Sequence, residues 1–535
     1  MWYPNQTSMM AVHVALARFL EKAGLMAAFG KYPYWYLGST PFRYLTGPVL
    51  PGILVGLHRA FPGLTLFELF FGLLGVFGLL GEVGVFFLVR TFQRLTPELL
   101  RFTPGVSLSS KTRDSSTPGV RVSGFNPGMA AFFYLLGPLA PVMFSFSDGL
   151  SIMAFSVVPW ALLFYLRLIR GIGPIGKENK KNEILFCILT TFLLLLDISI
   201  LPRLVLGMAA IFLATQDWKK AEKKIKKSTL LVAYSLLLVT IWYGLGYWWQ
   251  ILLAPSFAGK RLISVIGLIG QILPIGLAIG LAIVGGNIVK TKNRLTKFCF
   301  YWLFIFGFLT FVRFISDWDF VLDWSAYYLE IQLGLGILGA VLVDGLLKKH
   351  QKPKTTRLHQ LCWKHCGQED EKHKPKNIKI FAFLICVFSF LFLVFYFTFK
   401  RYVLSGLQRD IKTSVEYRKG EKLAEIVGPD DVVFLSGTLT FWTNAFFDIR
   451  QVRGGNDKAA VHPDWDKAAW ELREGEDIEK SLKWLREFKV KYLVVHTEDS
   501  KEYYHDFKHP EKFERVEDLE KIYDEKGDRI YRINF

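Results

Sequence analysis

Long apolar runs separated by short polar segments occupy most of the first 400 residues. The clearest run is 64–89, which is followed by Arg90 and Arg94. Further runs lie at 128–147, 150–168, 183–199, 201–215, 228–253, 262–289, 297–315, 326–347 and 377–400. A helix needs about 20 apolar residues to cross a bilayer, and most of these runs reach that length. The pattern predicts a polytopic α-helical membrane protein with about ten spans, in which 183–199 and 201–215 are short enough to be half-length helices.

The pattern changes from about Val415 to shorter apolar runs bounded by polar residues. Residues 431–436 and 490–496 are typical of buried strands, and 477–488 has the spacing of an amphipathic helix. Residues 522–533 predict a hairpin with its turn at 526–528. We therefore expect three regions along the chain. They are an outer-face loop with juxtamembrane helices at 1–62, a transmembrane domain at 63–400, and a small extracytoplasmic α/β domain at 401–535.

The stretch KYPYWYLGSTPFRYLTGPVLP, residues 31–51, belongs to none of the apolar runs. Its prolines and glycines exclude a membrane span. Its tyrosines and Trp35 indicate a membrane–water boundary, where an aromatic ring is buried while its polar tip stays wet. Two interpretations are open for this stretch, which also contains Arg43. It roofs a cavity formed by the helices that follow, or it anchors the chain at the membrane surface, where we also place helices at 11–30 and 51–61.

Composition supports the membrane class, since 51% of the residues are hydrophobic and the mean hydropathy is +0.28. The net charge of +18 is the sum of +22 at residues 1–400 and −4 at residues 401–535, which carry 24 Lys and Arg against 28 Asp and Glu. The excess falls in short loops between apolar runs, which fits the positive-inside rule and argues against nucleic acid. With the basic loops inside, both chain ends lie outside. An even number of crossings predicts that one further N-terminal span is missing from this chain.

Charged residues at the edge of a membrane are costly and need a reason. Those at the predicted outer face comprise the acids Glu68, Asp148, Asp197, Asp317, Asp319, Asp323 and Glu330, and the bases His13, Arg43, Arg203, Lys260, Arg261 and Arg313. Arginine and lysine would hold the phosphate of a phosphorylated lipid. A carboxylate would act as general base or hold a divalent metal, Mg or Mn. The alternative is that these charges are solvated beside the lipid headgroups.

A second candidate lies in the soluble part, at DIRQVRGG (448–455). It joins Arg450 and Arg453 to a pair of glycines, and could be an anion-binding turn that faces the membrane cavity. The alternative is a structural turn.

Three stretches carry a resemblance to a known family. They are HVALARFLEKAGLMAAFGKYPYWYLGSTPFRYLTGPVLP from His13, DWSAYYLEIQLGLGIL from Asp323, and DIRQVRGG with SLKWLREFKVKYLVVH in the tail. Together they resemble multi-pass membrane glycosyltransferases of the C-type fold, and most closely the branch labelled 6-pyruvoyl-tetrahydropterin synthase-related membrane proteins. No zinc-histidine signature of the soluble synthase is present, so the label does not imply pterin chemistry.

The resemblance implies transfer of a sugar from a polyprenyl-phosphate donor to a glycan, lipid or protein acceptor at the outer face of the cell membrane. It places an acid in the first outer loop, a few residues before a histidine like His13. The seven residues before His13 contain no acid. Asp148, in a second outer loop, matches another region where this fold carries an acid, and is the candidate base or metal ligand.

The expected substrate contacts are His13, Arg43, Lys260, Arg261, Asp323, Arg450 and Arg453. Of these, Arg43, Lys260 and Arg261 would hold the phosphate, while the C-terminal domain would hold the acceptor. The missing first-loop acid favours a second hypothesis, a non-catalytic membrane protein that binds lipid-linked glycans or scaffolds an envelope complex. A transporter ranks last, because the sequence has no internal repeat.

Overall fold

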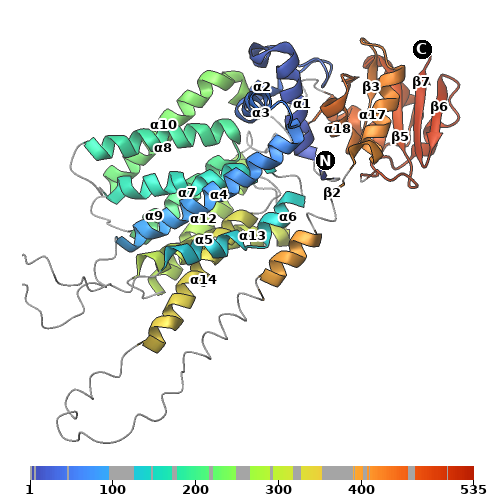
Figure 1. The fold of residues 1–535 in the computed structure, drawn as a ribbon. Helices are drawn as coiled ribbons and strands as arrows, with labels where there is room; N and C mark the ends of the chain where they lie inside the picture. The colour runs from blue at the N-terminus through green and yellow to red at the C-terminus, as the bar shows by residue number, and fades with distance from the viewer. Residues whose placement is uncertain are drawn as a thin grey trace, which may run out of the picture.

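The computed structural model describes residues 3–4, 8–44, 47–94, 126–145, 149–170, 177–215, 221–248, 265–288, 293–316, 327–351, 390, 392–401, 407–408, 410–455, 464–502 and 504–535 (Figure 1). A domain of packed helices occupies one side of the molecule, and a smaller domain built on a sheet occupies the other. Helix α1, near the N-terminus, lies where the two domains meet.

The helical domain contains α4 (Leu66–Arg94), α7 (Gly149–Arg170), α8 (Lys177–Leu196), α9 (Ile200–Thr215), α10 (Ala221–Tyr243), α12 (Val265–Ile288), α13 (Arg294–Ser316) and α14 (Tyr328–Gln351). Within the described residues, α4, α7, α10, α13 and α14 are long and apolar enough to cross a membrane. The predicted class, a polytopic helical membrane protein with a small C-terminal α/β domain, is confirmed.

Helix α7 forms the centre of the helical domain and packs against α4, α8 and α9. Glycine residues of α4 allow the closest approach between α4 and α7. A Cβ at Gly81 would lie 3.1 Å from Ser156, and one at Gly84 would lie 2.8 Å from the indole ring of Trp160. These contacts are of the kind that drives helix association in lipid, where close packing replaces the hydrophobic effect.

The run predicted as one span at 128–147 is instead two short helices, α5 (Pro127–Leu135) and α6 (Leu139–Ser145). Pro138 lies at the break, where its ring and missing N–H prevent a continuous helix. The side chain of Gln332 on α14 forms hydrogen bonds with the backbone at both helix ends that this break creates. Its Nε2 donates to the carbonyl of Tyr134 at 2.7 Å, and its Oε1 accepts from the amide of Ala140 at 2.9 Å.

The N-terminal region comprises α1 (Ser8–Ala23), the 3₁₀ helix η1 (Leu25–Phe29), α2 (Pro41–Tyr44) and α3 (Val49–Ala60). The sequence predicts helices lying on the membrane surface here, but α1 is enclosed by α3, α4 and α18 of the C-terminal domain. Its residues from Met10 to Ala17 are all buried. A helix covered on several sides does not need a polar face, which explains why its apolar residues exceed one stripe.

The C-terminal domain is a five-stranded sheet with the order β4-β3-β5-β7-β6. The strands are β3 (Val432–Phe434), β4 (Arg450–Gln451), β5 (Val490–His496), β6 (Leu519–Glu525) and β7 (Asp528–Ile533). The helices are α17 (Val415–Ile426), α18 (Leu439–Phe446), α19 (Trp465–Arg473) and α20 (Ile478–Glu487). Strands β3, β4 and β5 are parallel, whereas β7 pairs antiparallel with both β5 and β6.

The elements predicted in this domain are confirmed, including the hairpin that turns at Lys526 and Gly527. Short pieces complete the fold, namely the strands β1 (Tyr3–Pro4) and β2 (Leu407–Gln408), which pair with each other, and the 3₁₀ helices η6 (Ile411–Thr413) and η8 (Pro510–Phe513).

Candidate functional site

The aromatic stretch after η1 joins the two domains. Trp35 is completely buried, and its indole nitrogen donates a hydrogen bond of 3.0 Å to Oδ1 of Asn444 on α18. The amide of Gln451 on β4 donates to the carbonyl of Tyr34 at 3.0 Å. The ring of Trp35 is therefore enclosed by protein, and the part of this stretch that carries it serves as a contact between domains.

Charged side chains on α1 form ion pairs across the same contact between the two domains. Asp448, just before β4, pairs with Arg18 at 3.2 Å and with Lys22 at 2.5 Å. The glycine pair of DIRQVRGG faces Trp35, and a Cβ at Gly454 would come within 2.6 Å of that side chain. These glycines therefore let the indole approach the backbone.

His13 lies at the centre of α1 and is 1% exposed. Neither of its ring nitrogens has a hydrogen-bond partner among the described residues. Its ring stacks on Phe70 of α4 with a centroid distance of 6.4 Å, and burial lowers the pKa of His13 to about 4. Phe70 also touches the start of α7, since a Cβ at Gly149 would lie 3.0 Å from its ring. His13 is therefore a neutral, buried polar group at the junction of α1, α4 and α7.

An ion pair is buried between α9 and α14. Nε of Arg203 lies 3.4 Å from Oε1 of Glu330, and the side chains are 2% and 1% exposed. Each residue lies in the first turn of its helix, and Trp302 of α13 donates to the carbonyl of Glu330 at 2.6 Å. Taking two charges out of water is expensive, so a pair inside a membrane domain marks a candidate functional position.

The turn between α8 and α9 carries a further acid, Asp197. Its carboxylate accepts hydrogen bonds from the amide of Ser199 at 2.9 Å and from the hydroxyl of Ser151 on α7 at 3.3 Å. These bonds fix the turn against α7. The start of α9, and with it Arg203, is thereby held close to α7, the helix that follows Asp148 in sequence.

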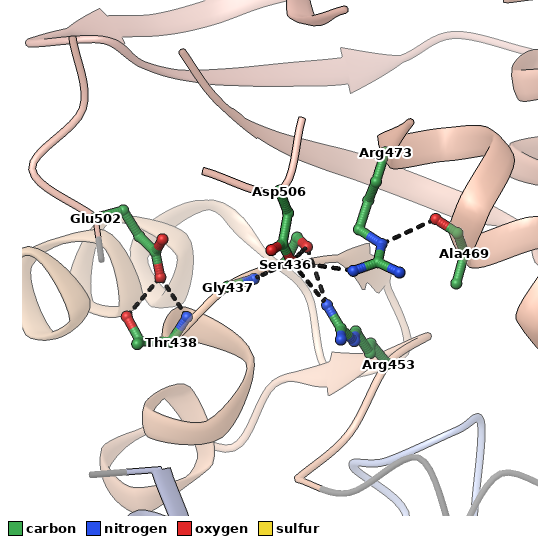
Figure 2. Close-up of polar contacts among 8 residues, drawn as sticks. All are labelled: Ser436, Gly437, Thr438, Arg453, Ala469, Arg473, Glu502 and Asp506. Atoms are coloured by element: carbon green, nitrogen blue, oxygen red, sulfur yellow. Dashed lines mark hydrogen bonds and ion pairs between the residues drawn. The ribbon is translucent and has the colours of Figure 1, made fainter. Parts of the chain in front are cut away.

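A cluster of polar side chains around Asp506 lies at the carboxyl ends of the parallel strands of the C-terminal sheet (Figure 2). Asp506 accepts from the hydroxyl of Ser436 and from the amide of Gly437 at 3.1 Å. Its Oδ2 also lies 3.1 Å from Arg453 and 3.2 Å from Arg473. Burial alone would raise the pKa of Asp506, but the Ser436 bond and the two arginines hold it below the usual value.

Beside this cluster, a buried row of ionisable groups continues along the same edge. Nδ1 of His496 lies 2.8 Å from Asp528, which also pairs with Lys419 at 3.1 Å. Glu502 accepts from the amide and hydroxyl of Thr438 at the start of α18. Burial lowers the pKa of His496, but the Asp528 bond and the charge of Glu502 outweigh it and raise the pKa above its usual value.

In open α/β sheets a ligand usually occupies the crevice beyond the carboxyl ends of the strands. Here that space is filled by the segment after β5, whose Glu502 and Asp506 take the hydrogen bonds of Thr438 and Gly437. The arrangement fastens the segment to the sheet through internal carboxylates. The sequence interpretation missed this network, although polar residues directly after the buried strands 431–436 and 490–496 were its signal.

The structure describes four of the eight predicted site residues, and their joint role in one site stays a prediction. His13 is buried under Phe70, Arg43 is exposed on α2, Arg450 pairs with Asp430 at 3.0 Å, and Arg453 pairs with Asp506. The other four, Asp148, Lys260, Arg261 and Asp323, lie outside the described residues. The joint role assigned to Arg450 and Arg453 stays a prediction.

No group of three or more His, Cys, Asp or Glu side chains that could hold a metal ion occurs within the described ranges. The predicted divalent metal stays a prediction. Asp148, the candidate metal ligand, lies outside those ranges.

No protein-family model matches this chain, and no curated protein matches it either. Among solved structures, the crystal structure of ArnT from Cupriavidus metallidurans bound to undecaprenyl phosphate matches with a TM-score of 0.47 and 12% sequence identity. The match covers 99% of this chain and 94% of that chain. A TM-score and identity this low assign neither a family nor a function to the chain.

Proposed function

We propose that this chain is a membrane glycosyltransferase that transfers a sugar from a polyprenyl-phosphate donor to a glycan, lipid or protein acceptor. The observation that carries the proposal is the position of His13. It is a buried, titratable side chain without a hydrogen-bond partner in the described part of the chain, and it lies where α4 and α7 meet α1 under the C-terminal domain. A reaction between a lipid-borne donor and an acceptor outside the bilayer needs polar groups at such a junction.

The proposed chemistry assigns the base role to Asp148, which directly precedes α7. Its carboxylate takes the proton of the acceptor hydroxyl, and the hydroxyl oxygen forms a bond to the anomeric carbon of the donor. The bond from that carbon to the phosphate oxygen breaks, so polyprenyl phosphate leaves and the configuration inverts. Arg43, Lys260 and Arg261 hold the phosphate, whose negative charge increases as the bond breaks.

The buried pair of Arg203 and Glu330 supports the proposal as a positioning element. Each side chain lies in the first turn of its helix, so the pair ties the starts of α9 and α14 together. Hydrogen bonds of Asp197 connect the start of α9 to α7. Helices α7, α9 and α14 are thereby held in one arrangement, as positioning of two substrates requires.

Glycan transfer in membranes tests the assignment of Asp148. We expect Asp148→Asn to abolish transfer, because an amide cannot accept the proton. Asp499→Asn, at an exposed position in the C-terminal domain, is the matched control and should transfer normally. Full transfer by Asp148→Asn, at equal protein level, would contradict the role of Asp148.

A non-catalytic protein that binds lipid-linked glycans is the second candidate. The absence of an acid in the seven residues before His13 favours it. The two candidates separate in one measurement, in which the chain is kept in its native membranes, which supply the acceptor, and a polyprenyl-phosphate sugar is added. Binding with release of polyprenyl phosphate supports the enzyme, whereas binding without any release supports the second candidate.

A further inference from the structure

The 3₁₀ helix η1 consists only of apolar residues, and its three large side chains are exposed. The exposed fractions are 50% for Leu25, 78% for Met26 and 48% for Phe29, whereas Ala28 is buried. One side of η1 thus packs on the protein, while the other presents only apolar side chains. Exposed apolar side chains that lie together mark a surface that contacts a partner or a membrane.

Gly24 separates η1 from α1, which ends at Ala23. Its φ of +84° is a conformation that glycine adopts without the steric cost of a Cβ. The amides of Ala27 and Gly30 donate to the carbonyls of Gly24 and Ala27, each at 3.0 Å. The glycine therefore allows the chain to leave α1, which is enclosed by protein, and to form a separate short element beside it.

η1 packs against the last turn of α10. The ring centroids of Phe29 and Trp242 lie 4.8 Å apart, and the indole nitrogen of Trp242 donates to the carbonyl of Phe42 on α2 at 3.0 Å. Residues four apart are neighbours on one face of a helix. The exposed side chains that continue from Trp242 along this face of α10 are Leu238, Tyr234 and Leu230. η1 therefore extends the exposed face of a helix that is long and apolar enough to cross a membrane.

The position of Trp242 along α10 gives the depth of this contact. α10 begins with a lysine-rich turn that includes the exposed Lys226, and its apolar part starts at Ser228. From Ser228 to Trp242 the helix rises about 21 Å, which is about 9 Å less than the hydrocarbon thickness of about 30 Å. Elements that lie at a membrane surface bury their apolar side about 5–10 Å deep. Phe29, in contact with Trp242, lies at this depth.

We propose that η1 inserts Leu25, Met26 and Phe29 into the lipid leaflet at the end of α10 that is remote from its lysines. Lipid is the partner because η1 continues the exposed apolar face of a membrane-spanning helix. The sequence predicts membrane contact for all of 11–30, whereas this proposal confines the contact to η1. Because η1 directly follows α1, the insertion fixes the height of α1, and of His13, relative to the bilayer. The proposal does not depend on sugar transfer.

Photocrosslinking of the full-length chain in native membranes tests the insertion. The probe is p-benzoylphenylalanine at the position of Met26, where the exposed side chain leaves room for a larger one. On irradiation the carbonyl oxygen of the probe takes the hydrogen of a neighbouring C–H group, and its carbonyl carbon forms a bond to that carbon. Mass spectrometry of the chain then shows whether the neighbour was lipid or protein.

Two exposed positions supply the controls. Ile241 on α10 is 76% exposed and lies in the membrane-spanning segment, whereas Trp470 is 52% exposed and lies in the C-terminal domain. We expect the yield of lipid adduct at position 26 to be close to that at 241 and at least about fivefold above that at 470, because hydrocarbon surrounds the first two. The probe at the position of Leu25 repeats the measurement, in case one variant fails to fold.

Two results would overturn the proposal. One is a yield of lipid adduct at positions 25 and 26 that is closer to that at 470 than to that at 241, since water would then surround η1. The other is crosslinking of these positions to protein without lipid, which would show that a second chain covers η1.

Discussion

The indole nitrogen of Trp35 donates a hydrogen bond to the side-chain oxygen of Asn444, which lies 409 residues further along the chain. Asn444 in turn donates from Nδ2 to the carbonyl of Ile449, next to β4, at 2.9 Å. One side chain of the N-terminal stretch is thus part of the hydrogen-bond network of the C-terminal sheet. The two domains are joined through this network and through the ion pairs of α1 with Asp448.

Replacing Trp35 with alanine should loosen the contact between the domains. The indole is fully buried against Gly454 and Gly455, and removing a buried aromatic side chain costs about 3–5 kcal/mol. Trp470→Ala is the control, because Trp470 is 52% exposed. Limited proteolysis of the solubilised chain should release the C-terminal domain faster from Trp35→Ala than from Trp470→Ala. Equal rates would show that this contact does not hold the domains together.

His13 should make the folded chain less stable at low pH. Its pKa is lowered to about 4 by burial, against about 6.5 for an exposed histidine. Between these values the unfolded chain binds the proton and the folded chain does not. Stability is therefore full above pH 6.5 and falls by about 3 kcal/mol as the pH decreases to about 4.

Thermal unfolding at pH 7 and pH 5 checks this dependence. In a His13→Phe variant, the melting temperature should decrease less between pH 7 and pH 5 than it does in the unchanged chain. The pH dependence that His496 contributes has the opposite sign, because its pKa is raised in the folded chain. His496 therefore stabilises the fold at pH values below its unfolded pKa. A His496→Phe variant should therefore show a steeper decrease. If His13→Phe keeps the full pH dependence, the histidine is not the group that titrates.

Removing one member of the Arg203–Glu330 pair should cost more than removing both. Glu330→Leu leaves the buried charge of Arg203 without its partner, which typically costs about 3–5 kcal/mol. The double variant Arg203→Leu with Glu330→Leu removes both charges from the apolar interior. Unfolding in detergent should show the double variant to be more stable than Glu330→Leu. A double variant that is less stable than the single one would contradict an energetic coupling between the two side chains.

Glycine at either left-handed lysine should stabilise the C-terminal domain. At Lys489 and Lys526 the positive φ places Cβ close to the backbone, and glycine removes this strain, so each variant should gain about 1 kcal/mol. The increase in melting temperature should be similar for the two. The control is Lys483→Gly, within α20, which should lose a comparable amount because glycine disfavours a helix interior. A loss of stability at Lys489 would show that its side chain makes a stabilising contact.

Periodic patterns predicted the elements whose environment is uniform along their length. The span at 150–168 is α7, and the strand at 490–496 is β5, because an apolar run needs burial whatever its partner. The predicted span at 128–147 was wrong, since Pro138 breaks it and the new ends depend on Gln332 from a distant helix. A hydropathy pattern contains no information about such a partner.

For the candidate site too, the sequence indicated individual residues, whereas the tertiary structure decided their partners. Charges such as Arg203 and Glu330 were recognisable in the sequence, because an ionisable residue in an apolar run is costly wherever it lies. That they pair with each other depends on how α9 and α14 pack. The clustering of Arg453 and Arg473 around Asp506 likewise depends on three segments that meet only at the sheet edge.

By itself, the sequence determined that apolar helices form a membrane domain and that a small α/β domain follows, because local hydropathy and spacing decide both. Only the tertiary structure decided that α1 is enclosed between these domains, that Trp35 faces protein, and that His13 is buried without a hydrogen-bond partner among the described residues. Each of these depends on contacts between residues far apart in the chain. The free energy of such contacts comes from shape and polar pairing across an interface, which no local pattern contains.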